Sequence, residues 1–316
     1  MGGRRTARAS TTPGEQPPRV LSLRGHEPVI PPRTAFEKEI RNLGQGRHQL
    51  WRVFADFCEM AAITWANIVP RDPALEARYL AIVGRYEREE VEVFPRLMGH
   101  LIDGLEDEPF GDFLGAQFMA LELGNHWKGQ YFTPTSLCDL MARMLYSREE
   151  TAAHVAAHGF ITLHEPAVGG AAMVLAFTGA MRAAGLNPQQ HLYVQAIDVD
   201  STAAYMAYVQ LALHHIPAVV YVGNTLTLEL REAWRTPAHH LGFWSSRLRA
   251  RERVAATGEE PEQKPAPDAP GLLVVTSADV TLPPQTDLFA TASAPRVRVV
   301  PRPDVTLPPQ TDLFAA

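Results

Sequence analysis

The spacing of apolar residues divides the chain into regions of different kinds. Over residues 35–124, apolar side chains recur three and four positions apart, as in Leu50, Val53, Phe54 and Phe57. This spacing places such side chains on one face of a helix, and several prolines interrupt the pattern between one helix and the next. The sequence therefore predicts an N-terminal helical domain over residues 35–124.

Short apolar runs alternate with helical segments in the next part of the chain. The predicted strands are Phe160 to Leu163, His191 to Ile197 and Ala218 to Val222. The predicted helices run from Gly170 to about Ala184 and from Thr202 to His215, the second with Ser201 as its N-cap. Strands that alternate with helices are typical of a parallel α/β fold. Thr227 to Arg235 is too polar for a buried parallel strand, so we expect only part of a parallel sheet.

Both ends of the chain differ from this pattern. Residues 1–34 hold six Arg against two acidic residues, and the tail from Glu259 onward holds eleven prolines and no Trp or Tyr. Such segments bury too little apolar surface to offset chain entropy, so we expect disorder over residues 1–34 and 250–316. No signal peptide or membrane-length apolar run is visible in the sequence, which leads us to expect a cytoplasmic protein.

Charge and cysteine usage limit the classes of function. The net charge of −6 argues against a purely electrostatic grip on nucleic acid, so DNA contacts must be local. The N-terminal arginines are one candidate, and the run at Arg247, Arg249, Arg251 and Arg253 is another, although such a run also suits the solvated face of a helix. Two cysteines without CxxC spacing, and His pairs without acidic or Cys neighbours at ligand spacing, predict neither a disulfide framework nor a metal site.

Candidate binding residues follow each predicted strand. The loop Glu165 to Gly170 follows the first strand, Asp198 ends the second and Asn224 follows the third. Ligands of parallel sheets bind beyond the carboxyl ends of the strands, where glycine lets the backbone approach and helix amides face the ligand. Each residue also has a structural alternative, namely a tight turn at Gly170, a helix cap at Asp198 and a loop residue at Asn224.

In their order and spacing, these residues resemble the amino-methylating adenine DNA methyltransferases, especially the modification subunits of type I restriction systems. The resemblance covers about residues 125–249 and implies a Rossmann-like class I methyltransferase fold that binds S-adenosylmethionine. It assigns the methionine part of the cofactor to Gln130, Tyr131, Phe132, Thr133 and Pro134 of GQYFTP. It assigns the cofactor loop to Glu165, Pro166 and Gly169, the ribose to Asp198 and the adenine to Asn224.

The chain departs from that family at the catalytic loop. The family has Asp, Asn or Ser followed by Pro-Pro and an aromatic residue, which hold the target amino group and stack on the flipped base. The nearest counterparts here are Thr236, Pro237 and His239, and the Leu-Pro-Pro-Gln sequences at Leu282 and Leu307. Three hypotheses stay open: a DNA adenine methyltransferase, a catalytically inactive adaptor that binds S-adenosylmethionine, and a subunit completed by a partner chain, for example another methyltransferase or specificity subunit.

A twelve-residue sequence, DVTLPPQTDLFA, occurs twice in the tail, at 279–290 and 304–315. Its QTDLF part resembles the bacterial sliding-clamp-binding pentapeptide, in which Leu and Phe enter a hydrophobic cleft and Gln binds at its rim. The resemblance implies a replication clamp as partner, and the alternative is a duplicated Pro-rich spacer. The residues assigned to partner binding are Gln285, Leu288, Phe289, Gln310, Leu313 and Phe314.

Overall fold

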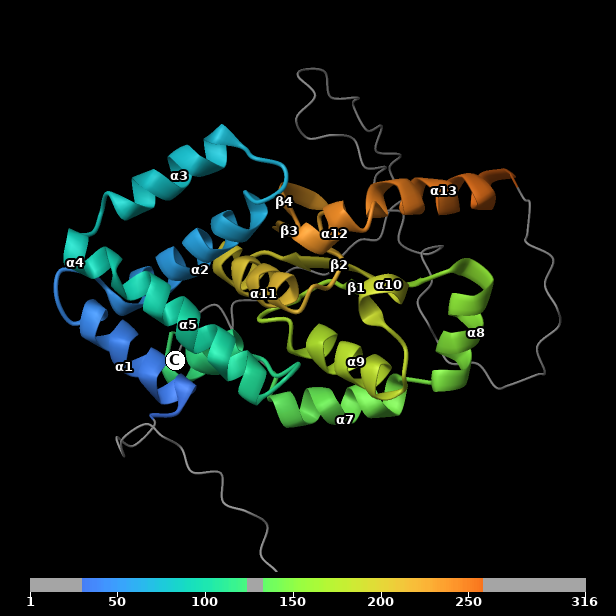
Figure 1. Cartoon of the computed structure of the whole chain (residues 1–316), viewed down its shortest axis with the longest axis horizontal. Coiled ribbons are helices and arrows are strands. Elements are labelled where there is room, and N and C mark those ends of the chain that lie inside the picture. The colour runs from blue at the N-terminus through green and yellow to red at the C-terminus, as the bar shows by residue number, and fades with distance from the viewer. Residues whose placement is uncertain (1–29, 124–132, 258–316) are drawn as a thin grey trace, which may run out of the picture. The chain divides into compact units, whose positions relative to one another are not determined.

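The computed structural model describes residues 30–123 and 133–257, which belong to one compact unit (Figure 1). Six helices precede the undescribed stretch 124–132: α1 (Pro32–Gly44), α2 (Leu50–Ala66), α3 (Pro73–Val83), α4 (Arg88–Val91), α5 (Val93–Asp107) and α6 (Phe113–Ala120). The elements after it are α7 (Thr135–Leu145), α8 (Arg148–His158), β1 (Ile161–Glu165), α9 (Ala172–Ala183), α10 (Pro188–His191), β2 (Leu192–Asp198), α11 (Ser201–Leu213), β3 (Ala218–Asn224), β4 (Glu229–Arg235), α12 (Pro237–Leu241) and α13 (Trp244–Thr257).

The described residues form one four-stranded sheet in the order β1-β2-β3-β4. The strands β1, β2 and β3 are parallel, which confirms the predicted α/β class and the partial parallel sheet. The strand β4 pairs antiparallel with β3, and the sequence did not predict it as a strand. Its polar residues are explained by its position at the sheet edge, because an antiparallel edge strand can leave one face in water.

The ends of α9 and α11 show how local sequence starts and stops these helices. Gly185 lies just beyond α9 with φ +85°, a left-handed conformation that glycine adopts without strain. At α11 the predicted N-cap, Ser201, is wrong. The cap is Asp200, whose Oδ1 accepts hydrogen bonds from the amides of Thr202 at 2.8 Å and Ala203 at 3.3 Å, while Ser201 is the first helical residue.

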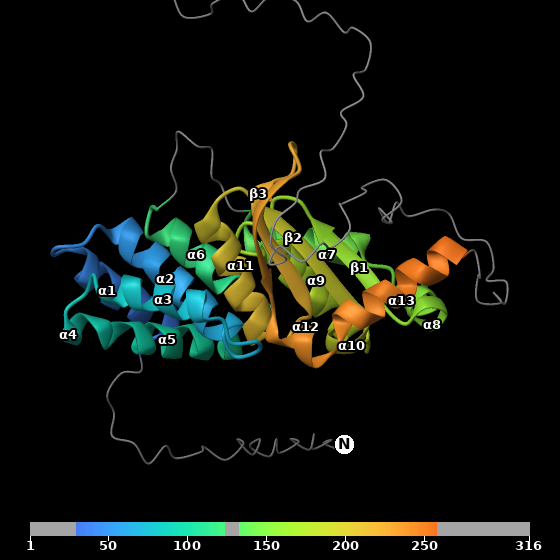
Figure 2. The same cartoon turned by 90° about the horizontal axis from the view of Figure 1, so that it is seen from above.

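Figure 2 shows helices on both sides of the sheet. Alternate residues of the strands face these two layers. On β2, Leu192, Val194 and Ala196 belong to the main apolar core, which includes residues of α9 and α11. The intervening Tyr193 faces the other layer, where its ring stacks on Trp244 of α13 at 5.3 Å between centroids. The sheet is therefore covered by α9 and α11 on one face and by α12 and α13 on the other.

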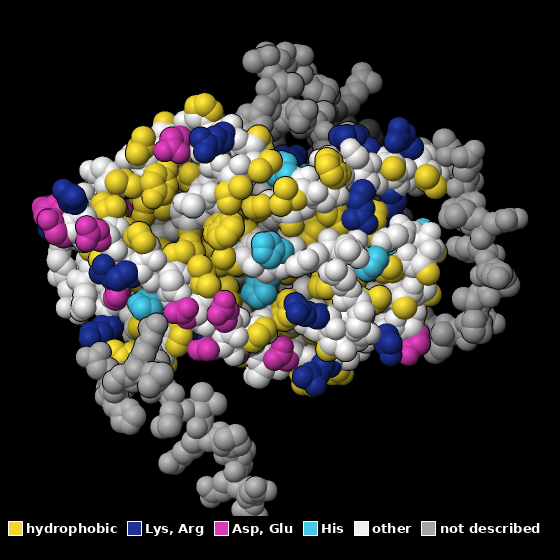
Figure 3. All heavy atoms as spheres, viewed as in Figure 1, with side chains coloured by type: hydrophobic (Ala, Val, Ile, Leu, Met, Phe, Trp, Pro, Cys, Tyr) yellow, Lys and Arg dark blue, Asp and Glu magenta, His cyan; other side chains and the backbone are white. Residues whose placement is uncertain are grey.

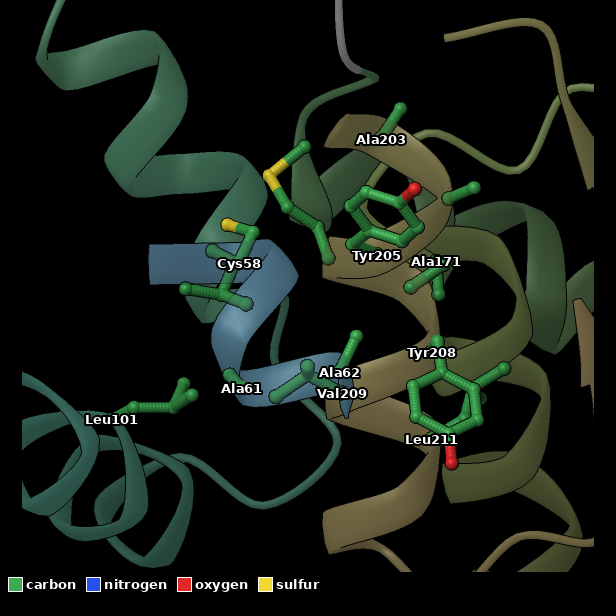
Figure 4. Packing of buried hydrophobic residues seen from close by; sticks show 14 of the residues in the cluster. Cys58, Ala61, Ala62, Leu101, Ala171, Ala203, Tyr205, Tyr208, Val209 and Leu211 are labelled. Carbon is green, nitrogen blue, oxygen red and sulfur yellow. The ribbon is translucent and has the colours of Figure 1, made fainter. Parts of the chain in front are cut away.

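The N-terminal helices share their core with the sheet. The main apolar cluster extends from Phe36 in α1 to Trp234 in β4 without a break between the helical and α/β regions. Figure 4 shows the join, where Ala61 and Ala62 of α2 lie beside α11. Small side chains let two helices approach closely. The helices within residues 30–123 and the sheet share one continuous apolar core.

The described residues also bear on the cysteines, on metal-binding groups, on the start of the tail and on membrane spans. Cys58 and Cys138 are buried free thiols, and no group of metal-binding side chains occurs within residues 30–123 and 133–257. The helix α13 continues to Thr257, past residue 250 at which the tail is predicted to start. No described helix combines the length and the apolar character that a membrane span requires.

Candidate functional site

The carboxyl ends of β1, β2 and β3 bring three of the predicted binding residues to one edge of the sheet. Glu165, Asp198 and Asn224 are the last residues of these strands. The strands are parallel and in close register, with Glu165 beside Ala196 and Asp198 beside Val222. Chain direction alone therefore places the three polar side chains along the same edge, which we call the carboxyl edge.

Two backbone amides of the loop after β1 donate hydrogen bonds to the end of β2. The amide of Gly169 donates to Asp198 Oδ2 at 2.9 Å, and the amide of Val168 donates to the carbonyl of Ile197 at 2.9 Å. The other oxygen of Asp198 accepts from the amide of Asp200 at 2.9 Å. The carboxylate is therefore held in one orientation.

Both carboxylates of this edge are electrostatically uncompensated. Burial is the largest cause that raises the pKa of Glu165, and the charge of Asp198 adds to it. Burial likewise raises the pKa of Asp198, although its amide hydrogen bonds act in the opposite direction. Neither forms an ion pair within the described residues. A ligand that brings hydroxyl donors or a positive charge would relieve this cost.

The backbone of the loop is unusual directly before α9. Gly169 has φ +54° and Ala171 has φ +78°, both in the left-handed region. Ala171 is fully buried and is the N-cap of α9. The first backbone amides of α9, which have no acceptor within the helix, therefore lie directly after this turn. Glycine adopts a positive φ without strain, whereas the side chain of Ala171 makes this conformation costly.

A buried hydrogen-bond network holds the loop between β1 and α9 in place, and the sequence gave no reason to expect it. Gln210 of α11 donates through Nε2 to the Gly170 carbonyl at 2.6 Å and to Asp112 Oδ1 at 2.9 Å. Its Oε1 accepts from the amides of Phe113 and Leu114 at 2.8 and 3.1 Å. Because Asp112 and Gln210 are 98 positions apart, no local pattern could reveal their pairing.

Asn224 has a structural role as well as its predicted one. Its side-chain oxygen accepts hydrogen bonds from the amides of Leu226 at 2.9 Å and Thr227 at 3.3 Å, so it stabilises the turn between β3 and β4. Only its amide group can serve a ligand. Two exposed apolar side chains border the same edge, namely Val199 at 62% and Leu226 at 95% exposure, and sequence reasoning missed both.

The GQYFTP segment is only partly within the described residues. Gln130, Tyr131 and Phe132 lie outside them, whereas Thr133 and Pro134 immediately precede α7, with Pro134 as its N-cap. Cys138 of α7 donates through its thiol to the Thr133 carbonyl at 3.7 Å. The tail residues assigned to a clamp, Gln285, Leu288, Phe289, Gln310, Leu313 and Phe314, also lie outside the described residues.

The weak catalytic candidates lie at the opposite end of the sheet. The strand β4 runs antiparallel, so Glu229 pairs with Asn224 at the carboxyl edge and Arg235 pairs with Val219 near the start of β3. Thr236 follows Arg235 and is fully buried. It therefore lies about six residues of strand, roughly 20 Å, from the carboxyl edge. The structure does not bring Thr236, Pro237 and His239 together with the predicted cofactor residues.

Thr236 and His239 instead make hydrogen bonds that secure α12 to the sheet. The Thr236 hydroxyl donates to the Ile216 carbonyl at 2.8 Å and accepts from the Ala218 amide at 3.0 Å. His239 Nδ1 lies 2.9 Å from the Tyr193 hydroxyl, and its Nε2 lies 2.8 Å from Ser245 Oγ. Burial lowers the pKa of His239 to about 3, so this imidazole is neutral and fully engaged at physiological pH.

A cavity of about 620 Å³ lies elsewhere on the described surface. Its walls come from the turn before α6, from α7, from the start of α8 and from the second half of α9. Small residues of α9 such as Gly179 and Ala180 form one wall. Glu165, Asp198 and Asn224 of the carboxyl edge do not line this cavity.

Comparison with known proteins relates part of this chain to one family. Residues 117–240 match the family model of the N-6 DNA methylases. No curated protein matches the chain. The matched segment includes β1, β2 and β3, the loop at Gly169, Asp198 and Asn224.

Two solved structures are similar to this chain. One is described as a class I S-adenosylmethionine-dependent methyltransferase from Listeria monocytogenes, with 13% identity and a TM-score of 0.32 over 60% of this chain and 52% of the other. The second is a type I restriction-modification methyltransferase subunit from Streptococcus thermophilus, with 18% identity and a TM-score of 0.29 over 62% and 40% of the two chains. This chain thus spans about half the length of these proteins or less.

Proposed function

Taking residues 117–240 as a segment of the N-6 DNA methylase family, we propose that this protein binds S-adenosylmethionine at the carboxyl edge and acts in adenine-specific DNA methylation. The single observation that carries the proposal is the loop before α9. There the Gly169 amide is tied to Asp198, and the backbone turns left-handed directly before a helix N-terminus. This geometry suits a ligand that approaches the backbone closely and offers hydroxyl groups to an oriented carboxylate.

The residues of the carboxyl edge fit this cofactor by their chemistry. Bound S-adenosylmethionine supplies an activated, positively charged methyl donor. Asp198 has lone pairs for the ribose hydroxyls, and Glu165 offers negative charge for a cationic group. The exposed Val199 and Leu226 offer apolar contact to a base. The raised pKa values of the two carboxylates are the cost that such a ligand would relieve.

A second function, binding of the cofactor without methyl transfer by the isolated chain, is favoured by the position of Thr236 and His239. Both are engaged in buried hydrogen bonds at the far end of the sheet. No other described segment after β3 supplies the polar residue, Pro-Pro and aromatic residue of the family's catalytic loop. In this version the protein is an adaptor, or a subunit whose catalytic residues come from a partner chain.

The proposal is tested by calorimetry with S-adenosylmethionine on the full chain. Asp198→Ala should weaken binding by about 1.5 to 3 kcal/mol, because it removes charge-assisted hydrogen bonds. Asp72→Ala is the matched control, since Asp72 also accepts a backbone amide, that of Ala74 at 2.8 Å, but at the start of α3. Absence of binding by the unmutated chain would contradict the proposal.

Transfer of labelled methyl groups to DNA that lacks adenine methylation separates the two functions. We expect little or no N6-methyladenine from the isolated chain, because its catalytic loop is not recognisable. Robust methylation would instead favour the enzyme and would require a catalytic segment outside Thr236 to His239.

We also propose that the repeated QTDLF sequences bind a bacterial sliding clamp. Phe289 and Phe314 are the only aromatic residues of the tail, one in each copy. Each Leu-Phe pair should contribute a few kcal/mol of apolar burial, less the cost of ordering the peptide. About 20 residues separate the copies, a typical reach of roughly 25 Å, so the second copy strengthens binding only where a second cleft lies within that distance.

Binding of tail peptides to the clamp tests this part. Leu288 and Phe289 are changed to Ala in one peptide, Leu313 and Phe314 in another, and all four in a third. The third peptide should lose binding. A third peptide that binds like the original, or an original that does not bind, would show that the repeat is a spacer.

A further inference from the structure

Two arginines of α13 are half-buried against the start of β1 and the helix α8. The guanidinium of Arg247 lies 3.7 Å from the centroid of the Trp244 ring and donates to the Gln190 carbonyl at 2.8 Å. Arg251 donates to Thr162 Oγ1 at 3.3 Å and lies 3.3 Å from His154 Nε2. Ring contacts and neutral acceptors therefore hold both cations in place.

Neither arginine has an acidic partner among residues 30–123 and 133–257. Other part-buried arginines of this chain do, such as Arg78 with Glu59 and Arg33 with Glu108. Burial lowers the pKa of Arg247 and of Arg251, which is the effect of desolvating a cation. A guanidinium that is half-buried without a counter-charge is a costly arrangement, and an anion in contact with it would remove the cost.

Three histidines lie around Arg251, and none of them supplies a negative charge to it. His154 and His158 of α8 lie with their ring centroids 4.4 Å apart, and His164 projects from β1. Burial lowers the pKa of His154 and of His164, and the charge of Arg251 adds to both effects. The Nε2 of His164 is buried and has no hydrogen-bond partner within the described residues.

The exposed side of α13 has the same sign of charge. Arg249 and Arg253 are exposed, and Glu252 is the only acidic residue among Trp244–Thr257. Figure 3 shows Lys and Arg side chains gathered over α13, and no Asp or Glu side chain is visible over that helix on this face. The sequence left open whether this arginine run is a solvated helix face. Because Arg247 and Arg251 are half-buried, the arginine run is not simply a solvated helix face.

We propose that Arg251, Arg247, His154 and Thr162 form an anion site that binds a phosphate group, of the kind carried by a nucleic-acid backbone. A guanidinium offers a planar set of donors that matches two phosphate oxygens, and the contacts of Arg251 with His154 and Thr162 fix its orientation before a ligand arrives. The aromatic faces of Phe160 and Trp244 position the cations without neutralising them.

This anion site is separate from the carboxyl edge. Thr162 is the second residue of β1, whereas Glu165 is its last. The site therefore does not depend on the proposed cofactor binding, and its test needs no S-adenosylmethionine. A phosphate contact here would give an acidic protein a local grip on nucleic acid that net charge alone does not provide.

The test measures binding of inorganic phosphate by calorimetry and of a mixed-sequence DNA duplex by fluorescence anisotropy, both with the full chain. Arg251→Gln should weaken each by about tenfold or more and reduce the slope of duplex affinity against salt by about one unit. Arg251→Lys keeps the charge and should retain part of the affinity. Arg182→Gln is the matched control, because Arg182 also lies over a phenyl ring, that of Phe110 at 5.7 Å.

Competition between the two probes identifies the source of the phosphate. If inorganic phosphate displaces the duplex, the site binds the nucleic-acid backbone. If the protein binds phosphate but not the duplex, the site binds a free phosphate compound. Thermal melting checks that the variants are folded, and His154→Gln provides a second variant if Arg251→Gln is not. Unchanged binding of both probes by Arg251→Gln and Arg247→Gln, or no binding by the unmutated chain, would overturn the proposal.

Discussion

The two ends of the same sheet have opposite chemical characters. At the carboxyl edge, Glu165 and Asp198 are carboxylates whose pKa values are raised by burial and which form no ion pair in the described structure. At the other end, Thr236 and His239 are fully hydrogen-bonded, and beyond them lies a helix rich in arginine. The comparison shows that polar residues at the ends of strands differ in role. Those without a charged partner are candidates for binding a ligand, whereas those whose hydrogen bonds are all made within the protein stabilise the fold.

The largest expected change in stability comes from Gln210, which holds the loop at the carboxyl edge in place. Gln210→Leu removes the partners of the Gly170 carbonyl, the Phe113 and Leu114 amides and the Asp112 carboxylate, all of them buried. We expect a loss of roughly 3 to 5 kcal/mol in the free energy of unfolding, since each unsatisfied buried group costs about 1 to 3 kcal/mol. Urea denaturation measures it.

The control for that variant is Gln195→Leu, a half-buried glutamine of β2. It should change the free energy of unfolding by less than about 1 kcal/mol, as substitutions away from buried networks usually do. Equal losses in the two variants would mean that the four bonds of Gln210 are not a special support for the loop.

Replacing one threonine by valine at each end of the sheet compares the two ends directly. Thr236→Val leaves the buried amide of Ala218 without its acceptor and should cost about 1 to 3 kcal/mol of stability without changing affinity for S-adenosylmethionine. Thr225→Val removes an exposed hydrogen bond to the Pro166 carbonyl and should cost less stability while loosening the loop. Thermal melting and calorimetry on both variants check this; weaker cofactor binding by Thr236→Val alone would reverse the assignment of the two ends.

The carboxylate of Glu165 has no ion-pair partner in the described structure. Replacing it by a neutral amide should therefore stabilise the protein but weaken its binding of S-adenosylmethionine. The raised pKa of Glu165 means that the folded state holds this proton more tightly than the unfolded chain. Stability therefore falls as pH rises above the ordinary glutamate pKa. Glu165→Gln removes that loss, so it should be more stable than the parent at neutral pH by up to about 1 kcal/mol, with the difference disappearing toward acid.

Melting curves as a function of pH, together with calorimetry, test the Glu165→Gln prediction. The variant should gain stability and lose affinity for S-adenosylmethionine together. A variant that is less stable than the parent at neutral pH would show that the carboxylate is satisfied in the free protein.

The smallest effect concerns the left-handed backbone at Ala171. Ala171→Gly relieves the strain of φ +78° but also removes a buried methyl group, so the stability should change by less than about 1 kcal/mol. Ala176→Gly, in the regular part of the same helix, should cost about 1 kcal/mol or more, because glycine weakens a helix interior and no strain is relieved. If the two variants lost equal stability, the positive φ would have no energetic consequence.

The sequence by itself determined the parallel strands, the loop between Glu165 and Gly170 and the acid at Asp198. These follow from local patterns, since alternating strands and helices impose parallel pairing, and parallel pairing places all strand ends on one edge. The family resemblance, which rested on those motifs, agrees with the N-6 DNA methylase match over residues 117–240. The binding roles of the individual residues stay predictions.

Only the tertiary structure decided the direction of β4, the support of the loop by Gln210 and the burial of Arg247 and Arg251. Because β4 runs antiparallel, Thr236 and His239 lie at the far end of the sheet, although they follow Asn224 by only 12 and 15 residues. Gln210 meets Asp112 across 98 positions. Such pairings depend on which surfaces pack together, and that is set by the whole core rather than by any local segment.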